Sequence, residues 1–322
     1  MTYSQPLNPT ELRNLFVAEA TTKFAANVPD FVSLRKFVAD RGGTFLNDHG
    51  AIRTADAGLC GLLARAARVL GLRRESNYWF PTKKLISFDL QVIGERADQF
   101  KIFVSQIDLT AFPETVADLI REDCREQAAA VDHAPLLELI GRAEREGGLA
   151  ADDAERFVRH LVDRLMARPG PPLKRATLDA VAAISGEAAS ALALGPDLNH
   201  ITIDVRAAGF SGIEEMTDAM RAQGFRMLPQ IQGTYDDALR QTATMAATMA
   251  TPVREADGSV GTAATERQFV EIIERNQQRD TDGAPLWTQD GRPLIFRGFI
   301  AANAEKIFDA ASTKPTVAST PS

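Results

Sequence analysis

Two short stretches of the 322-residue chain decide the predicted fold: NDHGAIRT at residues 47–54 and LNHITIDV at residues 198–205. The chain has only four histidines, and His49 and His200 each stand in one of these strand-like stretches. Each stretch leads into an amphipathic helical pattern that ends at a glycine, Gly71 or Gly224, 22 and 24 residues after the histidine. The similar order and spacing predict a duplicated unit with one histidine at the head of each copy.

Strand-like runs follow the helical pattern in both copies. They fall at 84–92 and 100–109 in the first copy, and at 226–233, 239–246 and 269–275 in the second. The sequence therefore predicts an α+β protein built from two βαβββ-like units. The predicted divisions are an N-terminal helical cap (1–43), a first unit (44–112), a helical insertion (113–195), a second unit with a closing helix (196–310) and a polar, disordered tail (311–322).

A third candidate ligand accompanies the two histidines. In FVEIIER (269–275), alternation places Glu271 between two apolar residues on one face of a strand. Burying an unpaired carboxylate is costly, so a cation partner is expected, and a metal is one candidate. Two histidines and one carboxylate make a facial triad that leaves coordination positions open for substrate and oxygen. Glu274 falls on the other face, where we expect it to be solvated or paired with Arg275.

Each histidine also has a simpler interpretation. His49 alone is equally well explained as a partly buried structural histidine followed by a surface Arg53. Residues 49, 51 and 53 share a strand face, however, so Arg53 could meet the imidazole in one cavity and read a carboxylate with its planar fork. For His200 alone a solvated strand face is the better interpretation, and only the repeat favours a ligand. His133 and His160 are interpreted as surface or helix-face residues.

Composition excludes several classes of protein. The net charge of −7 argues against a nucleic-acid or anionic-membrane partner, and no apolar run approaches the roughly 20 residues that span a bilayer. The N-terminal stretch lacks a signal-peptide pattern, and Cys60 and Cys124 are expected to be free thiols, which predicts a cytoplasmic protein. Phosphate-binding, dinucleotide and serine-hydrolase motifs are absent from the sequence. The sequence is compatible with a homo-oligomer.

The segments HGAIR, LNHIT and FVEIIER, with IFVSQI and LRQTAT between them, resemble the 2-oxoadipate dioxygenase/decarboxylase (hydroxyglutarate synthase) family over about residues 40 to 300. FVEIIER with RGFIAANAEKIF also resembles the last strand and closing helix of 4-hydroxyphenylpyruvate dioxygenase, a more distant relative in the vicinal oxygen chelate superfamily. The resemblance implies two vicinal-oxygen-chelate-like modules around a non-haem Fe(II) ion held by His49, His200 and Glu271. Zn, Ni or Mn could substitute for iron in such a triad.

The resemblance also implies a reaction. A 2-oxo dicarboxylic acid, 2-oxoadipate or a close relative, would react with O2 to give 2-hydroxyglutarate and CO2, as in lysine catabolism. Arg53 would bind a substrate carboxylate, and Ser105, Gln241 and Thr242 are candidate contacts to the distal carboxylate, although strand packing explains these three as well. Many family members continue well past the last ligand, whereas this chain ends at Ser322, so the particular 2-oxo acid stays open.

Two other classes of protein share this module architecture. A glyoxalase-like isomerase or lyase uses its metal as a Lewis acid and often has a second carboxylate ligand. A non-catalytic small-molecule-binding protein would bind no metal. The strand of the first copy that is comparable with FVEIIER offers Ser105 or Gln106 instead of a carboxylate. This asymmetry favours the oxygenase.

Overall fold

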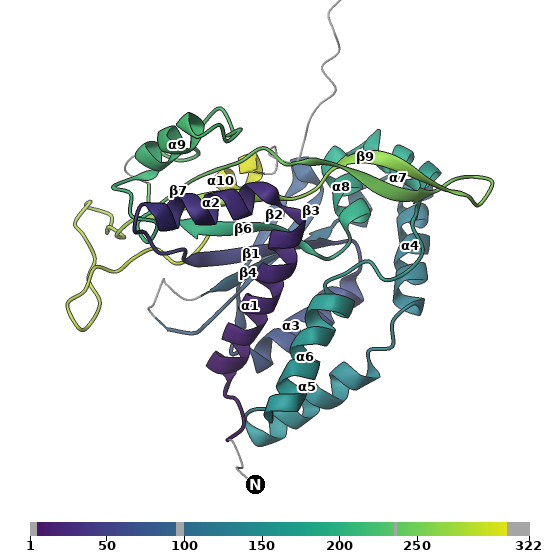
Figure 1. Cartoon of the computed structure of the whole chain (residues 1–322), viewed down its shortest axis with the longest axis horizontal. Helices are drawn as coiled ribbons and strands as arrows, with labels where there is room; N and C mark the ends of the chain where they lie inside the picture. The colour runs from purple at the N-terminus through teal and green to yellow at the C-terminus, as the bar shows by residue number, and fades with distance from the viewer. Residues whose placement is uncertain (1–4, 95–99, 235–236, 308–322) are drawn as a thin grey trace, which may run out of the picture.

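The computed structural model of the chain describes residues 5–94, 100–234 and 237–307. A mixed seven-stranded sheet forms its centre and helices cover the sheet, so the fold is α+β, as predicted (Figure 1). Within these residues, no helix is long and apolar enough to cross a membrane. The predicted tail at 311–322 lies outside the described residues.

The strands fall mainly into two groups along the chain, separated by a run of helices. The strands are β1 (Asn47–Thr54), β2 (Arg73–Phe80), β3 (Leu85–Gln91), β4 (Lys101–Ile107), β5 (Leu173–Lys174), β6 (Leu198–Asp204), β7 (Leu239–Ala243), β8 (Thr248–Arg254), β9 (Val260–Glu266) and β10 (Phe269–Arg275). The α-helices are α1 (Pro9–Asn27), α2 (Pro29–Asp40), α3 (Ala57–Val69), α4 (Glu114–Ala129), α5 (Ala134–Glu146), α6 (Ala151–His160), α7 (Arg175–Ala182), α8 (Gly186–Leu194), α9 (Ile213–Ala222) and α10 (Ala301–Ile307).

The order of the strands brings the two histidine strands together. The sheet runs β2-β3-β4-β1-β6-β10-β7, so the first half supplies four strands and the second half three. In the first half β4 returns beside β1 in parallel, and in the second half β10 returns beside β6 in parallel. Strands β1 and β6 pair with each other in antiparallel orientation and join the halves. The three central strands β1, β6 and β10 are therefore neighbours.

Alternation along these strands separates two faces of the sheet. Ile52, Ile201 and Ile272 point into a large apolar core that also contains residues of α1, α2, α3 and α9. Ala51 and Phe103 point to the opposite face, where a second core forms with α4, α7 and α8. Residues next to Ile201 and Ile272 in sequence consequently face the second side. This is the side on which the candidate ligands His200 and Glu271 meet.

The N-terminal helices begin where local sequence signals place them. The side chain of Asn8 accepts hydrogen bonds from the backbone N–H groups of Thr10 and Glu11, and Glu11 accepts one from the N–H of Asn8, which forms a capping box. Pro9 occupies the first turn, where its missing N–H costs nothing. Helix α1 then packs against α6 of the predicted insertion (Figure 1).

The second half departs from the predicted strand pattern. Residues 226–233 do not form a strand: Met227 and Gln232 make only isolated bridges, and Pro229 between them has no N–H to donate to a ladder. Strands β8 and β9, which we did not predict, form a hairpin that pairs with β5 in a separate three-stranded sheet. Their small residues give a weak hydrophobic alternation, so the sequence carried little signal for them.

Candidate metal site

Three buried side chains from adjacent strands converge on one point. His49 comes from β1, His200 from β6 and Glu271 from β10, and their exposed fractions are 2%, 4% and 2%. The Oε2 atom of Glu271 lies 3.0 Å from Nε2 of His200 and 3.4 Å from Nε2 of His49. One ligand atom from each residue lies within 4.8 Å of the others, so the group could hold a metal ion.

The separations between these atoms suit coordination. Two donors about 2.1 Å from one metal and at right angles to each other are about 3 Å apart, close to the separations observed. The hydroxyl of Thr202 belongs to the same cluster. It donates a 3.0 Å hydrogen bond to Oε2 of Glu271 and also lies 3.0 Å from Nε2 of His49. We did not predict Thr202 as a site residue. The available signal was its position two residues after His200, on the same strand face.

Burial and charge set the protonation of the three groups. Burial raises the pKa of the Glu271 carboxyl, but the two histidines beside it outweigh burial and bring the pKa to about 2. Burial lowers the pKa of His200 to about 4. The pKa of His49 is raised, because Glu271 and Asp48 outweigh the opposing effect of burial. A metal would need the carboxylate ionised and both imidazoles neutral, so metal binding would displace any proton that His49 holds.

The residue before each histidine orients its ring. Oδ1 of Asp48 lies 2.8 Å from Nδ1 of His49, and Oδ1 of Asn199 lies 3.1 Å from Nδ1 of His200. A hydrogen bond at Nδ1 leaves Nε2 free to face the metal position, an arrangement typical of metal-binding histidines. The sequence signal for both partners, a polar residue before each repeated histidine, was present in NDH and LNH.

The first half lacks a carboxylate equivalent to Glu271. In the second half, β10 pairs with β6 so that Phe269 lies opposite His200, and Glu271 follows two residues later. In the first half, Lys101 lies opposite His49, and the residue two positions later is Phe103. The comparable residue is therefore Phe103, and our assignment of Ser105 or Gln106 identified the correct strand but the wrong position.

Arg53 lies on the face of β1 that carries His49, but it already has an anionic partner. Its guanidinium, 1% exposed, forms an ion pair with the buried Glu187 of α8. Burial lowers the pKa of Arg53, while the negative charges of Glu187 and Glu271 act in the opposite direction. We did not predict Glu187, although an acidic residue in the Ala-rich segment GEAASALAL was a signal.

The other three predicted substrate contacts have different surroundings. Gln241 lines the cavity beside the ligands. Ser105 is buried, and its hydroxyl accepts a 2.8 Å hydrogen bond from Ser87 on the neighbouring strand. Thr242 is fully buried and donates to the carbonyl of Gln230 at 3.4 Å, and the residues that line the cavity do not include it.

The cavity at the ligands is small and capped. Its volume open to the centre of a water molecule is about 20 Å³, little more than one water needs. The ring of Phe299 covers it, with its centroid 4.8 Å from that of His49 and 4.8 Å from that of Phe103. Helix α10 adds Ala304 and Ile307 to the lining.

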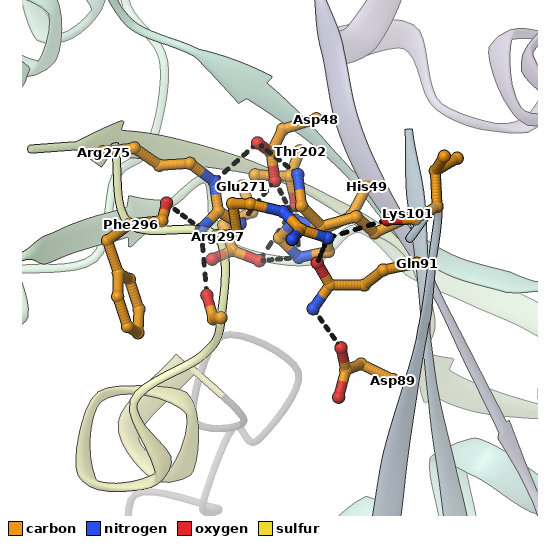
Figure 2. A network of polar contacts seen from close by, with 12 residues as sticks. Asp48, His49, Asp89, Gln91, Lys101, Thr202, Glu271, Arg275, Phe296 and Arg297 are labelled. Carbon is orange, nitrogen blue, oxygen red and sulfur yellow. Dashed lines mark hydrogen bonds and ion pairs between the residues drawn. The ribbon is translucent and has the colours of Figure 1, made fainter. Parts of the chain in front are cut away.

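Asp48 belongs to a buried network of charged groups. Arg275, at the end of β10, donates two hydrogen bonds to the Asp48 carboxylate, at 2.7 and 2.8 Å, and Nζ of Lys101 lies 3.3 Å from Oδ2 (Figure 2). Burial raises the pKa of Asp48, but the two cations outweigh it and hold the pKa well below its usual value. The expected pairing of Glu274 with Arg275, or its solvation, is wrong. Glu274 is buried and pairs with Arg240 at 3.3 Å.

The remaining polar residues singled out in the sequence lie away from the ligands. His133 and His160 are half-buried and contact each other, with 3.1 Å between Nδ1 and Nε2. Cys60 and Cys124 are free thiols, as expected.

The fold and the converging ligands define an α+β protein with a buried two-histidine, one-carboxylate site. The sequence model of the family described as 2-oxoadipate dioxygenase/decarboxylase matches residues 16–290. The chain belongs to this family.

Similar proteins agree with this assignment. A 2-oxoadipate dioxygenase/decarboxylase of Mycobacterium tuberculosis is 25% identical over 85% of this chain and 72% of its own length. Among solved structures, a glyoxalase-superfamily protein of Ralstonia eutropha JMP134 has a TM-score of 0.75 at 20% identity, with 84% of this chain and 85% of that chain covered. The hydroxyglutarate synthase of Oryza sativa in complex with 2-oxoadipate has a TM-score of 0.72 at 18% identity, with 97% of both chains covered. These structures share the fold.

Proposed function

We propose that the chain is a non-haem Fe(II) enzyme that converts 2-oxoadipate, or a close 2-oxo dicarboxylic acid, and O2 into 2-hydroxyglutarate and CO2. The observation that carries the proposal is the convergence of His49, His200 and Glu271 in a chain that belongs to this family. Fe(II) would be held by these three residues and would supply the redox chemistry, with open coordination positions for substrate and O2. The same triad could take Zn, Ni or Mn.

The proposed architecture is two vicinal-oxygen-chelate-like modules, over residues 44–112 and 196–310. In each half, the last strand lies parallel to the first strand and beside it, and the first strand carries the histidine. This repeated arrangement supports the two modules. Residues 1–43 would form a helical cap and residues 113–195 an insertion. The insertion supplies Glu187, so it would contribute to the site as well as to the fold.

The chain's own residues would bind and orient the substrate. Arg53 would bind one substrate carboxylate, and the incoming carboxylate would compete with Glu187 for the guanidinium. Gln241, on the cavity wall, is placed to contact a second polar group, whereas Ser105 and Thr242 would act through neighbours. Phe103 and Phe299 would exclude water from the reacting groups, which strengthens the electrostatic interactions there.

A glyoxalase-like isomerase or lyase is less well supported. That class often uses a second carboxylate ligand, and Phe103 stands where the first half would have to provide it. Among the described residues, the only cluster that could hold a metal contains one carboxylate. A non-catalytic binding protein would not need a triad whose carboxylate is buried with two imidazoles.

Oxygen uptake and isotope incorporation test the proposal together. Purified protein loaded with Fe(II) should consume O2 in the presence of 2-oxoadipate and release CO2. With ¹⁸O2, one labelled atom should enter the new carboxylate and one the 2-hydroxyl group, because the reaction replaces the lost carboxylate with one oxygen and adds the other to the chain. The same assay across a panel of 2-oxo acids would identify the preferred substrate.

The control is His49→Ala, which should bind less metal and show background uptake. Background uptake by wild-type protein with full metal occupancy would show that the assigned reaction is wrong. An unlabelled product that has the same mass as the substrate would support an isomerase instead.

A further inference from the structure

Arg275 makes hydrogen bonds in two directions from the end of β10. On one side, Nε and Nη2 donate to the two oxygens of Asp48, at 2.7 and 2.8 Å. On the other side, Nη1 donates to the carbonyls of Phe296 and Gly298, at 3.2 and 2.9 Å. The side chain is buried, and Figure 2 shows it between Asp48 and the backbone of the C-terminal segment. One guanidinium thus joins two separate parts of the molecule.

The first part is the metal ligand His49. Asp48 accepts both hydrogen bonds from Arg275 while its Oδ1 also contacts Nδ1 of His49, at 2.8 Å. The position of Arg275 therefore fixes the carboxylate that orients the imidazole ring. Such hydrogen bonds behind a ligand commonly change metal affinity 10- to 100-fold when they are removed.

The second part is the cap over the cavity, which we define as residues 296–307. Its Phe299 ring lies perpendicular to the His49 ring, at 89°, and the guanidinium of Arg275 lies 5.5 Å from the Phe299 centroid. Further along the cap, the Asn303 side chain donates to the carbonyl of Leu239 at 2.9 Å. The cap is also held by Arg297, which donates to the carbonyl of Val92 at 2.7 Å, by the N–H of Phe296, which donates to the carbonyl of Asn276 at 3.0 Å, and by Ile307 in a small apolar cluster. The cap contributes no strand to the main sheet.

The cap leaves little room beside the ligands. The volume there, about 20 Å³ for the centres of water molecules, is about that of one water, so a six-carbon dicarboxylate would need the cap to move outward. Phe299, Ala304 and Ile307 all belong to the cap and to the cavity wall. Outward movement of the cap would take the carbonyls of Phe296 and Gly298 away from Arg275 and would leave its hydrogen bonds to Asp48.

We propose that Arg275 is a positioning residue that links the orientation of His49 to closure of the cap. In the closed position, the carbonyls of Phe296 and Gly298 fix the guanidinium of Arg275. Arg275 then fixes Asp48, which keeps the His49 ring in the orientation that can ligate a metal. Metal binding at His49 in turn favours the closed cap, because coupling between two sites is reciprocal. The inference rests on the proposed metal site and on a substrate much larger than a water molecule, but not on the identity of the metal.

The test measures Co²⁺ affinity and amide hydrogen exchange of residues 296–307, without substrate. In wild-type protein, Co²⁺ should slow exchange in the cap. Arg275→Gln should bind Co²⁺ 10- to 100-fold more weakly. Its cap amides should exchange faster than in the wild type, and Co²⁺ should no longer slow them. Arg275→Lys keeps the charge but not the planar fork, so it should recover part of the affinity while the cap still exchanges fast.

Arg240→Gln is the matched control, because Arg240 is also a buried arginine that pairs with carboxylates on the sheet, Glu274 and Glu214. It should leave both Co²⁺ affinity and cap exchange near their wild-type values. The inference is overturned if Arg275→Gln and Arg240→Gln behave alike, or if Arg275→Gln weakens Co²⁺ binding with the Co²⁺-dependent protection of the cap unchanged. Failure of wild-type protein to bind Co²⁺ would instead contradict the proposed metal site.

Discussion

His49 and His200 occupy equivalent places in the two halves of the sheet, yet their surroundings differ in charge. The ring of His49 is oriented by Asp48, which Arg275 and Lys101 hold. The ring of His200 is oriented by the neutral Asn199, whose amide donates to the backbone carbonyl of Arg267. The first half therefore supports its ligand with a charged network that reaches the C-terminal cap, whereas the second half uses one local amide.

The two halves differ again beyond the histidines. The second half provides the carboxylate, Glu271, where the first half has Phe103. Four residues after its histidine, the first half has Arg53, and the second half has Asp204. The comparison fits the proposed division of roles, in which the second half would complete the metal ligands and the first half would bind the substrate and orient His49.

The largest effect is expected from the one ligand that breaks the symmetry. Glu271→Gln removes the only anionic ligand and replaces it with a poorer donor, so metal affinity should fall by more than about 100-fold, beyond the range for supporting residues. Metal content after dialysis would measure this. Glu274→Gln, on the opposite face of β10, is the control and should retain its metal. Equal metal retention by both variants would contradict the assignment of Glu271 as a ligand.

A smaller effect is expected from the substrate side of the first half. The double variant Arg53→Gln, Glu187→Gln removes both charges of the buried pair, so neither is left without its partner. Losing a charge-assisted hydrogen bond to a substrate carboxylate should cost about 1.5–3 kcal/mol, which is about a 10- to 100-fold increase in KM. Steady-state oxygen uptake would measure KM, while Co²⁺ affinity should change little. An unchanged KM would remove Arg53 from the substrate site.

The last prediction concerns stability rather than activity. It depends on Lys101, whose counterpart in the second half is the apolar Phe269. Burial lowers the pKa of Lys101 from its usual value of 10.5 to about 8. Between these two pH values the unfolded chain binds a proton that the folded protein has released, so stability rises with pH. The shift corresponds to a gain of up to about 3 kcal/mol over this window.

Lys101→Met should remove this pH dependence. Urea unfolding at pH 7.5 and pH 10, compared between wild type and variant, would measure the difference, since other titrating groups contribute equally to both proteins. The same change in stability with pH in both proteins would show that Lys101 does not titrate in this range.

Much of the site could be predicted from the sequence. The repeated histidine and the strand alternation around Glu271 identified the three residues that converge, because alternation fixes which side chains share a face. The α+β class followed from the same patterns. The hairpin of β8 and β9 could not be predicted, since small residues alternate too weakly, and Pro229 interrupts the predicted strand at 226–233.

The partners of the charged residues were not predictable in the same way. Arg275 lies 227 residues from Asp48 in the chain, and Glu187 comes from a helix of the insertion. The expected pairing of Glu274 with its neighbour Arg275 was wrong because each finds its partner on another strand: Glu274 pairs with Arg240, and Arg275 binds Asp48. Only strand order brought Arg275 to Asp48 and Arg240 to Glu274.

The sequence by itself determined the fold class and the three candidate ligands, because both can be read from strand and helix periodicity and from the repeat of the histidine segment. The tertiary structure decided which cation holds Asp48, which anion holds Arg53 and what covers the site. Those choices depend on strand register and on packing between distant segments. Burial makes each pairing strong, since an unpaired charge in the interior is costly, but no local pattern specifies the partner.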